Sequence, residues 1–211
     1  MSNNYTHYHD ILLPKILQEP EVIYLRSINQ KRLFARQRMR LIRKAVSKYC
    51  EKQIVPVGNL QVKSRKTTSF SIEIEFDHFI VSLRSSIEHL MQLINFISDL
   101  DLSPSSYNHN HRVDLDNVIN HLKNADNTIL CKLATYLERE KSEDWYKMLH
   151  KLRIELYHDK FEKFMVNGDS ISLKLPGETE TDLLTYCITT TANVERVLSY
   201  GLNSLIKFQG W

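Results

Sequence analysis

The stretch from Ser142 to Lys160 gathers side chains that can transfer protons and bind anions. Its apolar residues recur at helical spacing and predict a helix capped by Ser142; they are Trp145, Met148, Leu149, Leu152 and Leu156. At about 100° per residue, six side chains fall on an arc away from this stripe. They are Tyr146, His150, Arg153, Ile154, Tyr157 and His158. Since an imidazole titrates near neutral pH and a guanidinium binds anionic oxygens, this arc either lies in solvent or meets another molecule.

The segment Leu152–Asp159 (LRIELYHD) resembles the R-x4-6-H motif of the HEPN superfamily, in its R-x4-H form. The order of the expected elements is also similar, because a long helix that includes Phe79–Leu90 comes early and shorter helices precede the motif helix. The resemblance covers roughly residues 70–211 and leaves out the N-terminal region.

The resemblance implies a homodimer in which two motif helices face each other and form one composite site. Many HEPN proteins are metal-independent endoribonucleases of toxin–antitoxin or antiphage systems. The resemblance therefore implies an RNA substrate, an antitoxin or defence-system partner protein, and no metal or other cofactor. Carried onto this chain, His158 would be the general acid/base and Arg153 would hold the scissile phosphate. His150 and Tyr157 would help to position the substrate.

Two residues depart from the family pattern. Ile154 follows the arginine, where active members commonly carry a polar residue such as Asn or Asp. An aliphatic side chain at this place favours a packed interface, so the alternative hypothesis is a non-catalytic HEPN-like module for dimerisation or nucleic-acid binding. Lys160 stands where one subgroup carries a tyrosine that is modified, so that regulation is not implied here.

The net charge of +3 conceals a strong asymmetry along the chain. From Val22 to Lys66 there are thirteen basic residues and one acidic residue, a charge of +12, which leaves −9 on the remainder. Apolar residues are interleaved at helical spacing, so Lys31–Lys52 is expected to form an amphipathic basic helix. This helix either presents a solvated face or contacts the phosphates of a nucleic acid. The expected phosphate contacts are Arg36, Arg40, Arg43 and Lys44.

The fold class expected is mainly α: a HEPN-like helical bundle with a small β-hairpin before the last helix and a basic helical region at the N-terminus. The expected division is a basic N-terminal helical region, residues 1–66, and a HEPN-like helical domain, residues 67–211. A short helix is expected over Tyr8–Leu17 and a linker over residues 59–69. Alternating apolar residues over 70–76 are compatible with a short strand.

The later elements follow from local patterns. Apolar residues every three or four positions from Phe76 to Ile94 predict a long helix that ends near Asp99. Shorter helices are expected over 115–122 and after Asn127, which can act as an N-cap. Asn167-Gly168 is a turn signal between alternating segments and predicts the hairpin. The last helix is expected to begin at a cap provided by Thr179 or Thr181.

Several classes of protein are excluded. No apolar run approaches a membrane span, and three widely spaced cysteines form no disulfide or zinc pattern, so a cytoplasmic protein is expected. Phosphate-binding loop, dinucleotide-binding and hydrolase motifs are absent from the sequence. The histidine pairs His7/His9 and His109/His111 lack further ligands at metal-site spacing and are expected to be exposed loop residues.

Overall fold

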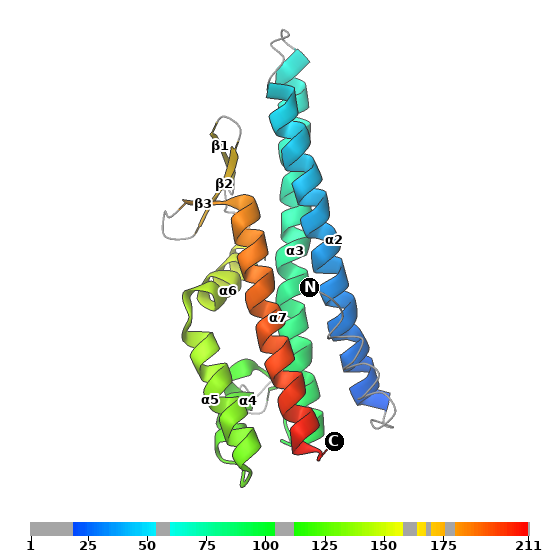
Figure 1. Cartoon of the computed structure of the whole chain (residues 1–211), viewed down its shortest axis with the longest axis vertical. Coiled ribbons are helices and arrows are strands. Elements are labelled where there is room, and N and C mark those ends of the chain that lie inside the picture. Colours follow the sequence, from blue (N-terminus) through cyan, green and yellow to red (C-terminus); the bar gives the residue numbers. More distant parts are fainter. Residues whose placement is uncertain are drawn as a thin grey trace. The chain divides into compact units, whose positions relative to one another are not determined.

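The computed structural model describes residues 19–53, 60–103, 112–157, 164–167, 170–175 and 180–210. Over these residues the protein is mainly helical, with six helices and a small antiparallel sheet before the last helix, which confirms the expected mainly α class with a small β element at that place (Figure 1). The helices are α2 (Glu19–Gln53), α3 (Leu60–Ser98), α4 (Leu115–Lys123), α5 (Thr128–Ser142), α6 (Asp144–Tyr157) and α7 (Leu183–Phe208). The strands are β1 (Phe164–Asn167), β2 (Ser170–Lys174) and β3 (Glu180–Asp182).

The chain divides into two compact units with interleaved segments. The first unit takes its described residues from 1–31, 85–143 and 194–211, and the second from 32–84 and 144–193. Helices α2, α3 and α7 therefore contribute residues to both units, whereas α4 and α5 belong to the first and α6 and the sheet to the second.

Helix α2 buries one narrow seam, and its other described side chains are half-buried or exposed. Its buried residues recur at spacings of three, four or seven; they are Leu25, Ile28, Arg32, Ala35, Ile42 and Val46. This spacing is that of helices which pack side by side. Contacts with α3 occur in each unit: Tyr24 stacks on Phe96 in the first, and Arg38 pairs with Glu75 in the second. The expected basic helix is confirmed, and it is longer than the sequence pattern indicated.

Helix α3 replaces two expected elements. The linker over residues 59–69 and the strand over 70–76 are wrong, because the helix runs without interruption from Leu60. Ile72 and Phe76 are buried and continue the spacing of the later helix, whereas Ile74 is 39% exposed. A strand would have placed all three on one face. The burial of Ile72 and Phe76 on one side of a helix therefore outweighs the strand-like alternation of apolar residues over 70–76.

The end of α3 near Asp99 is confirmed, and a specific motif explains it. Asp99 has φ of 50°, in the left-handed region, and the Leu100 N–H donates to the Asn95 carbonyl at 3.1 Å. The Asp99 N–H donates to the Phe96 carbonyl, which completes a Schellman motif. The buried Asn95 side chain then hydrogen bonds both the N–H and the carbonyl of Leu102, so the chain leaves the helix in a defined direction.

The capping predictions are partly confirmed. Asn127 caps α5 by accepting from the Ile129 and Leu130 N–H groups. Ser142 is not the cap of the following helix: it is the last residue of α5, and its hydroxyl donates to the Arg139 carbonyl at 2.6 Å. Helix α6 begins at Asp144, whose carboxylate suits the positive end of a helix.

The hairpin is confirmed by pairing from Phe164↔Leu173 to Asn167↔Ser170. Asn167 is thus a strand residue, not a central turn residue, and Gly168 lies outside the described residues. A third strand, β3, was not expected from the sequence. Thr181 lies within it and is not the cap of α7; Asp182 has this role, because its carboxylate accepts from the Thr185 N–H at 2.7 Å.

Among the described helices, none is both long enough and apolar enough to cross a lipid bilayer. The short helix expected over Tyr8–Leu17, the histidine pairs and the alternative cap Thr179 lie outside the described residues.

Candidate nucleic-acid interface

The four basic residues expected to contact phosphates lie together on α2. Arg36, Arg40, Arg43 and Lys44 are all exposed, and Lys48 continues the row. At 100° per residue the first four occupy an arc of about 100° that flanks the buried seam of α2. Because each helical residue rises about 1.5 Å, Arg36, Arg40, Lys44 and Lys48 follow one another at intervals of about 6 Å. We call these five residues the α2 basic face.

No acidic residue lies among the members of the α2 basic face along the helix. No Asp or Glu occurs between Val22 and Cys50. Like charges three or four residues apart on a helix repel each other by a few tenths of a kcal/mol per pair. The face contains four such pairs: 36/40, 40/43, 40/44 and 44/48. A bound polyanion would reduce the repulsion within these pairs.

Apolar side chains border the basic residues. Leu33 is 65% exposed and lies within the same arc, and Phe34 is 47% exposed on its flank. Phe34 and Ile42 are both among the apolar residues interleaved in this helix, but they do not share one environment, since Ile42 is fully buried. The structure therefore adds an exposed aromatic ring beside the row of cations. Aromatic rings next to cations are typical of surfaces that bind single-stranded nucleic acid.

The residues of the motif helix are described only in part. On α6, His150 is exposed, Arg153 is half-buried and Ile154 is 45% exposed. The Nε and Nη1 atoms of Arg153 are shielded from solvent. His158 and the side chain of Tyr157 lie outside the described residues, so the geometry between Arg153 and His158 stays a prediction.

Tyr146 does not belong to the exposed arc of α6. It is 7% exposed, and its ring packs edge-on against Trp145 at a centroid distance of 5.6 Å. Arg84 of α3 donates a hydrogen bond to its hydroxyl and lies over its ring at 5.1 Å. The core face of α6 is confirmed at Leu149 and Leu152, which are fully buried. It is wider than expected, because α3 offers Tyr146 both a hydrogen-bond donor and a cation for its ring.

The α2 basic face and the arc of α6 do not form one site within the second unit. Figure 1 shows α2 and α6 on opposite sides of α3. The sequence had assigned both to RNA, and the structure leaves them as two separate surfaces of one chain.

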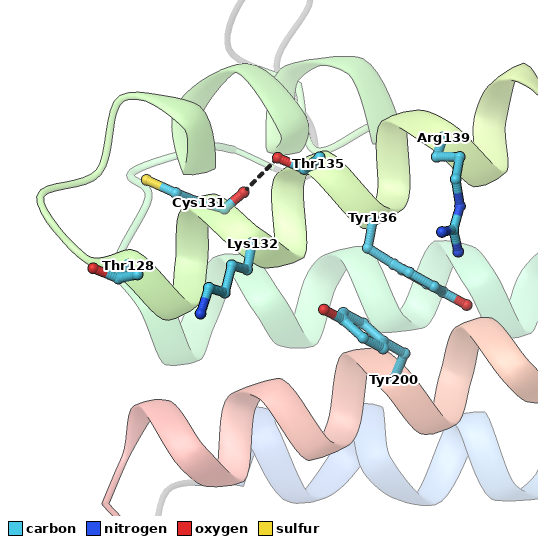
Figure 2. A pocket seen from close by; sticks show the side chains of 7 residues that line it. All are labelled: Thr128, Cys131, Lys132, Thr135, Tyr136, Arg139 and Tyr200. Atoms are coloured by element: carbon cyan, nitrogen blue, oxygen red, sulfur yellow. Dashed lines mark hydrogen bonds between the residues drawn. The ribbon is translucent and has the colours of Figure 1, made fainter.

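A third cluster, between α5 and α7 in the first unit, was not expected from the sequence. An open pocket of about 500 Å³ is lined by Thr128, Cys131, Lys132, Thr135, Tyr136, Arg139 and Tyr200 (Figure 2). The six residues of α5 follow helical spacing along one stripe. Tyr136 and Tyr200 stack with centroids 3.8 Å apart and planes at 15°. The tyrosines are 64 positions apart in the chain, so only a prediction of the helix pairing would have found them.

A buried carboxylate organises the rim of this pocket. The Glu140 side chain is 4% exposed and accepts from Arg139 at 3.0 Å and Arg196 at 2.7 Å. Burial by itself would raise the pKa of Glu140, but the hydrogen bonds from Arg196 and Arg139 outweigh it and hold the pKa below its usual value. Burial, and then the charge of Glu140, raise the pKa of Tyr136, so its phenol is neutral at physiological pH.

No group of three or more metal-ligating side chains occurs within the part of the chain that the structure describes. Comparison with protein families, with curated proteins and with solved structures finds no match to this chain.

Proposed function

We propose that this chain binds RNA, and that it does so through the α2 basic face. The observation that carries the proposal is the row of five exposed cations on a helix stretch without a single acidic residue. A nucleic-acid strand is the common polyanion whose charges repeat at a spacing comparable to that row. The resemblance of residues 152–159 to the HEPN motif favours RNA over DNA.

Binding of this kind is driven by the release of counterions from the strand. Each phosphate that a cation neutralises contributes about −0.7 to the slope of log K against log salt for a single strand. Five contacts therefore give a slope of about −3 to −4. The side chains Leu33 and Phe34 add contacts that do not depend on salt, because apolar and stacking contacts carry no charge.

The test compares two variants with equal net charge. In the first, Arg40, Arg43 and Lys44 are changed to Gln. In the matched control, three exposed basic residues outside the face are changed to Gln: Arg112, Lys174 and Lys207. We expect the first variant to bind a single-stranded RNA at least tenfold more weakly than the parent, and its salt slope to fall by about 2. The control should bind like the parent. If both variants lose the same affinity, net charge and not the α2 basic face drives binding, and the proposal fails.

A second candidate function is metal-independent cleavage of RNA by a HEPN-type homodimer. The observation in its favour is that Ile154, next to Arg153 in the R-x4-H segment, is 45% exposed in the single chain and His150 is exposed beside it. An apolar side chain exposed at that place suits a second copy of the chain, and the dimer would bring two arginines and two histidines together. Arg153 would hold the phosphate and His158 would transfer the proton.

Two measurements test this candidate. Total RNA is incubated in EDTA with the parent, with Arg153→Ala and with His158→Ala, and the products are analysed for 2′,3′-cyclic phosphate ends. Cleavage should be lost in both variants, and cleavage at the parental rate in either would remove that residue from the mechanism. In light scattering, Ile154→Asp should convert a dimer into a monomer; a monomeric parent would contradict the composite site. If the parent dimerises without cleaving RNA, the alternative of a non-catalytic HEPN-like module is favoured.

A further inference from the structure

The tyrosines of the α5–α7 pocket form a stack with one open end. Arg139 lies over the Tyr136 ring at 5.1 Å, and Tyr136 in turn stacks on Tyr200 at 3.8 Å. Tyr136 is 9% exposed, whereas Tyr200 is 37% exposed. Tyr136 covers part of Tyr200, and the rest of Tyr200 lines the pocket, where a further planar group can contact it. Figure 2 shows the Tyr136 and Tyr200 rings next to each other, between α5 and α7.

The stack is held in place before any ligand arrives. Glu140 binds Arg139 from the same helix and Arg196 from α7, so a single buried carboxylate ties the two helices together beside the rings. Tyr136 and Tyr200 lie within one turn of these charged residues, on α5 and α7 respectively. A ligand therefore meets an ordered platform, which lowers the entropy lost on binding.

The charge of the pocket selects an anion. Lys132 is exposed on α5, one turn before Tyr136, and Figure 2 shows its side chain on the side of the Tyr200 hydroxyl. Arg139 and Arg196 share the buried carboxylate of Glu140 at the rim. Thr128 adds a hydroxyl group to the lining, whereas the Thr135 hydroxyl donates to the Cys131 carbonyl at 3.0 Å. A flat ring that carries a negative group fits these side chains, and a nucleobase with its phosphate is the common ligand of that kind.

We propose that the α5–α7 pocket is a nucleotide site in which the base stacks on Tyr200 and Lys132 binds the phosphate. The same chemistry is presented by a free mononucleotide and by one base of a single strand, and the test separates these two sources. The site involves neither the α2 basic face nor the arc of α6, so it stands or falls independently of the proposed function.

The test measures equilibrium binding of adenosine 5′-monophosphate (AMP), ribose 5-phosphate and an adenylate hexamer to the full chain. We expect Tyr200→Ala to weaken binding of AMP, of the hexamer or of both by about 5- to 150-fold, the range typical of one base stacked on an aromatic ring. Tyr200→Phe keeps the ring and should bind within about twofold of the parent. Lys132→Gln should weaken binding of the same probes, and ribose 5-phosphate should bind far more weakly than AMP because it has no ring.

Phe96→Ala is the matched control. Phe96 is also 37% exposed and stacks on another ring, that of Tyr24 at 5.4 Å, so its loss tests whether any exposed aromatic residue has the same effect. It should bind all probes like the parent.

The outcomes identify the ligand or overturn the site. Tyr200-dependent binding of AMP assigns a free nucleotide, and Tyr200-dependent binding of the hexamer alone assigns a base within a strand. The proposal is overturned if neither probe binds, or if Tyr200→Ala binds both as the parent does while its melting curve shows it folded. The Arg40/Arg43/Lys44→Gln variant should still bind AMP, so failure of the α2 basic face is distinguishable from failure of this site.

Discussion

Replacing Arg40 with Glu is expected to make the free protein more stable. Arg40 is exposed and has a like charge at each of three helical neighbours: Arg36 at i−4, Arg43 at i+3 and Lys44 at i+4. Each pair destabilises the helix by about 0.2–0.5 kcal/mol, and an opposite charge stabilises it by a similar amount. Glu and Arg have nearly equal helix propensity, so the change in charge dominates.

The expected magnitude follows from the three pairs. The change from repulsion to attraction amounts to about 0.4–1 kcal/mol per pair, or about 1–3 kcal/mol in total at low ionic strength. Screening by solvent and salt brings the expectation to the lower end of this range, about 1 kcal/mol. For a protein of this size that corresponds to a rise in Tm of about 2–4 °C. Arg40→Gln removes the repulsion without adding attraction, so it should give about half the rise.

The assay is thermal unfolding followed by circular dichroism, at about 20 mM and 500 mM NaCl. The Debye length falls from about 20 Å to about 4 Å between these concentrations, so the rise should largely disappear at the higher one. Lys151→Glu on α6 is the matched control, because it makes the same change of charge between Lys147 at i−4 and Glu155 at i+4, whose effects cancel. An unchanged or lower Tm for Arg40→Glu at low salt would refute the reasoning, since the basic face would then already be neutralised within the chain.

The same variant should bind RNA more weakly than Arg40→Gln does. The substitution would then raise stability and lower RNA binding at one residue.

Three further substitutions test the packing that supports the sites. Glu140→Gln should lower the free energy of unfolding by about 2 kcal/mol at pH 7, because the variant loses charged hydrogen bonds. The pKa of Glu140 in the folded protein lies below the ordinary 4.5. In acid-unfolding measurements the difference in stability between parent and variant should therefore shrink as the pH falls below 4.5. Gly201→Val should lower the free energy of unfolding, measured with denaturant, by about 2–3 kcal/mol, since even a Cβ at this position would lie 2.8 Å from Leu90 Cδ2. When Leu90→Ala is combined with it, the loss of stability should be smaller than the sum of the two single losses. Asp99→Gly should raise Tm slightly, by up to about 1 kcal/mol of stability, because glycine adopts the left-handed conformation without strain; a lower Tm would show that the Asp side chain itself supports the turn.

Local patterns were reliable where the contrast between apolar and polar positions was strong. The helix through Phe76–Ile94, the cap at Asn127 and the hairpin before the last helix agree with the structure. The local patterns failed where a strand-like and a helical spacing of apolar residues overlapped. They also failed where several neighbouring residues could act as the N-cap of a helix. Residues 70–76 alternate like a strand, yet Ile72 and Phe76 are buried as helical neighbours, and Asp182 instead of Thr181 caps α7. Burial against partner helices, which no local pattern contains, decides such cases.

The candidate sites, too, were predicted in part from the sequence and in part depend on the tertiary structure. The charge of residues 22–66 is a property of the sequence alone, and with helical geometry it places Arg36, Arg40, Arg43 and Lys44 on one arc. The histidine, arginine and tyrosine side chains of residues 150–158 are likewise visible in the sequence; their proposed roles stay predictions, and His158 is not among the described residues.

Which surfaces these residues occupy was decided by tertiary structure. Arg32 is buried in the α2 seam and Phe34 is exposed beside the cations, although hydrophobicity would assign them the other way. Tyr146 is buried and does not lie on the exposed arc of α6, because Arg84 of α3 donates a hydrogen bond to its hydroxyl. The Tyr136–Tyr200 stack exists because α5 packs on α7 around Glu140. A sequence specifies charge and helical phase through neighbours a few residues apart, whereas a pocket depends on which helix faces are pressed together, and that is set by packing across long separations in the chain.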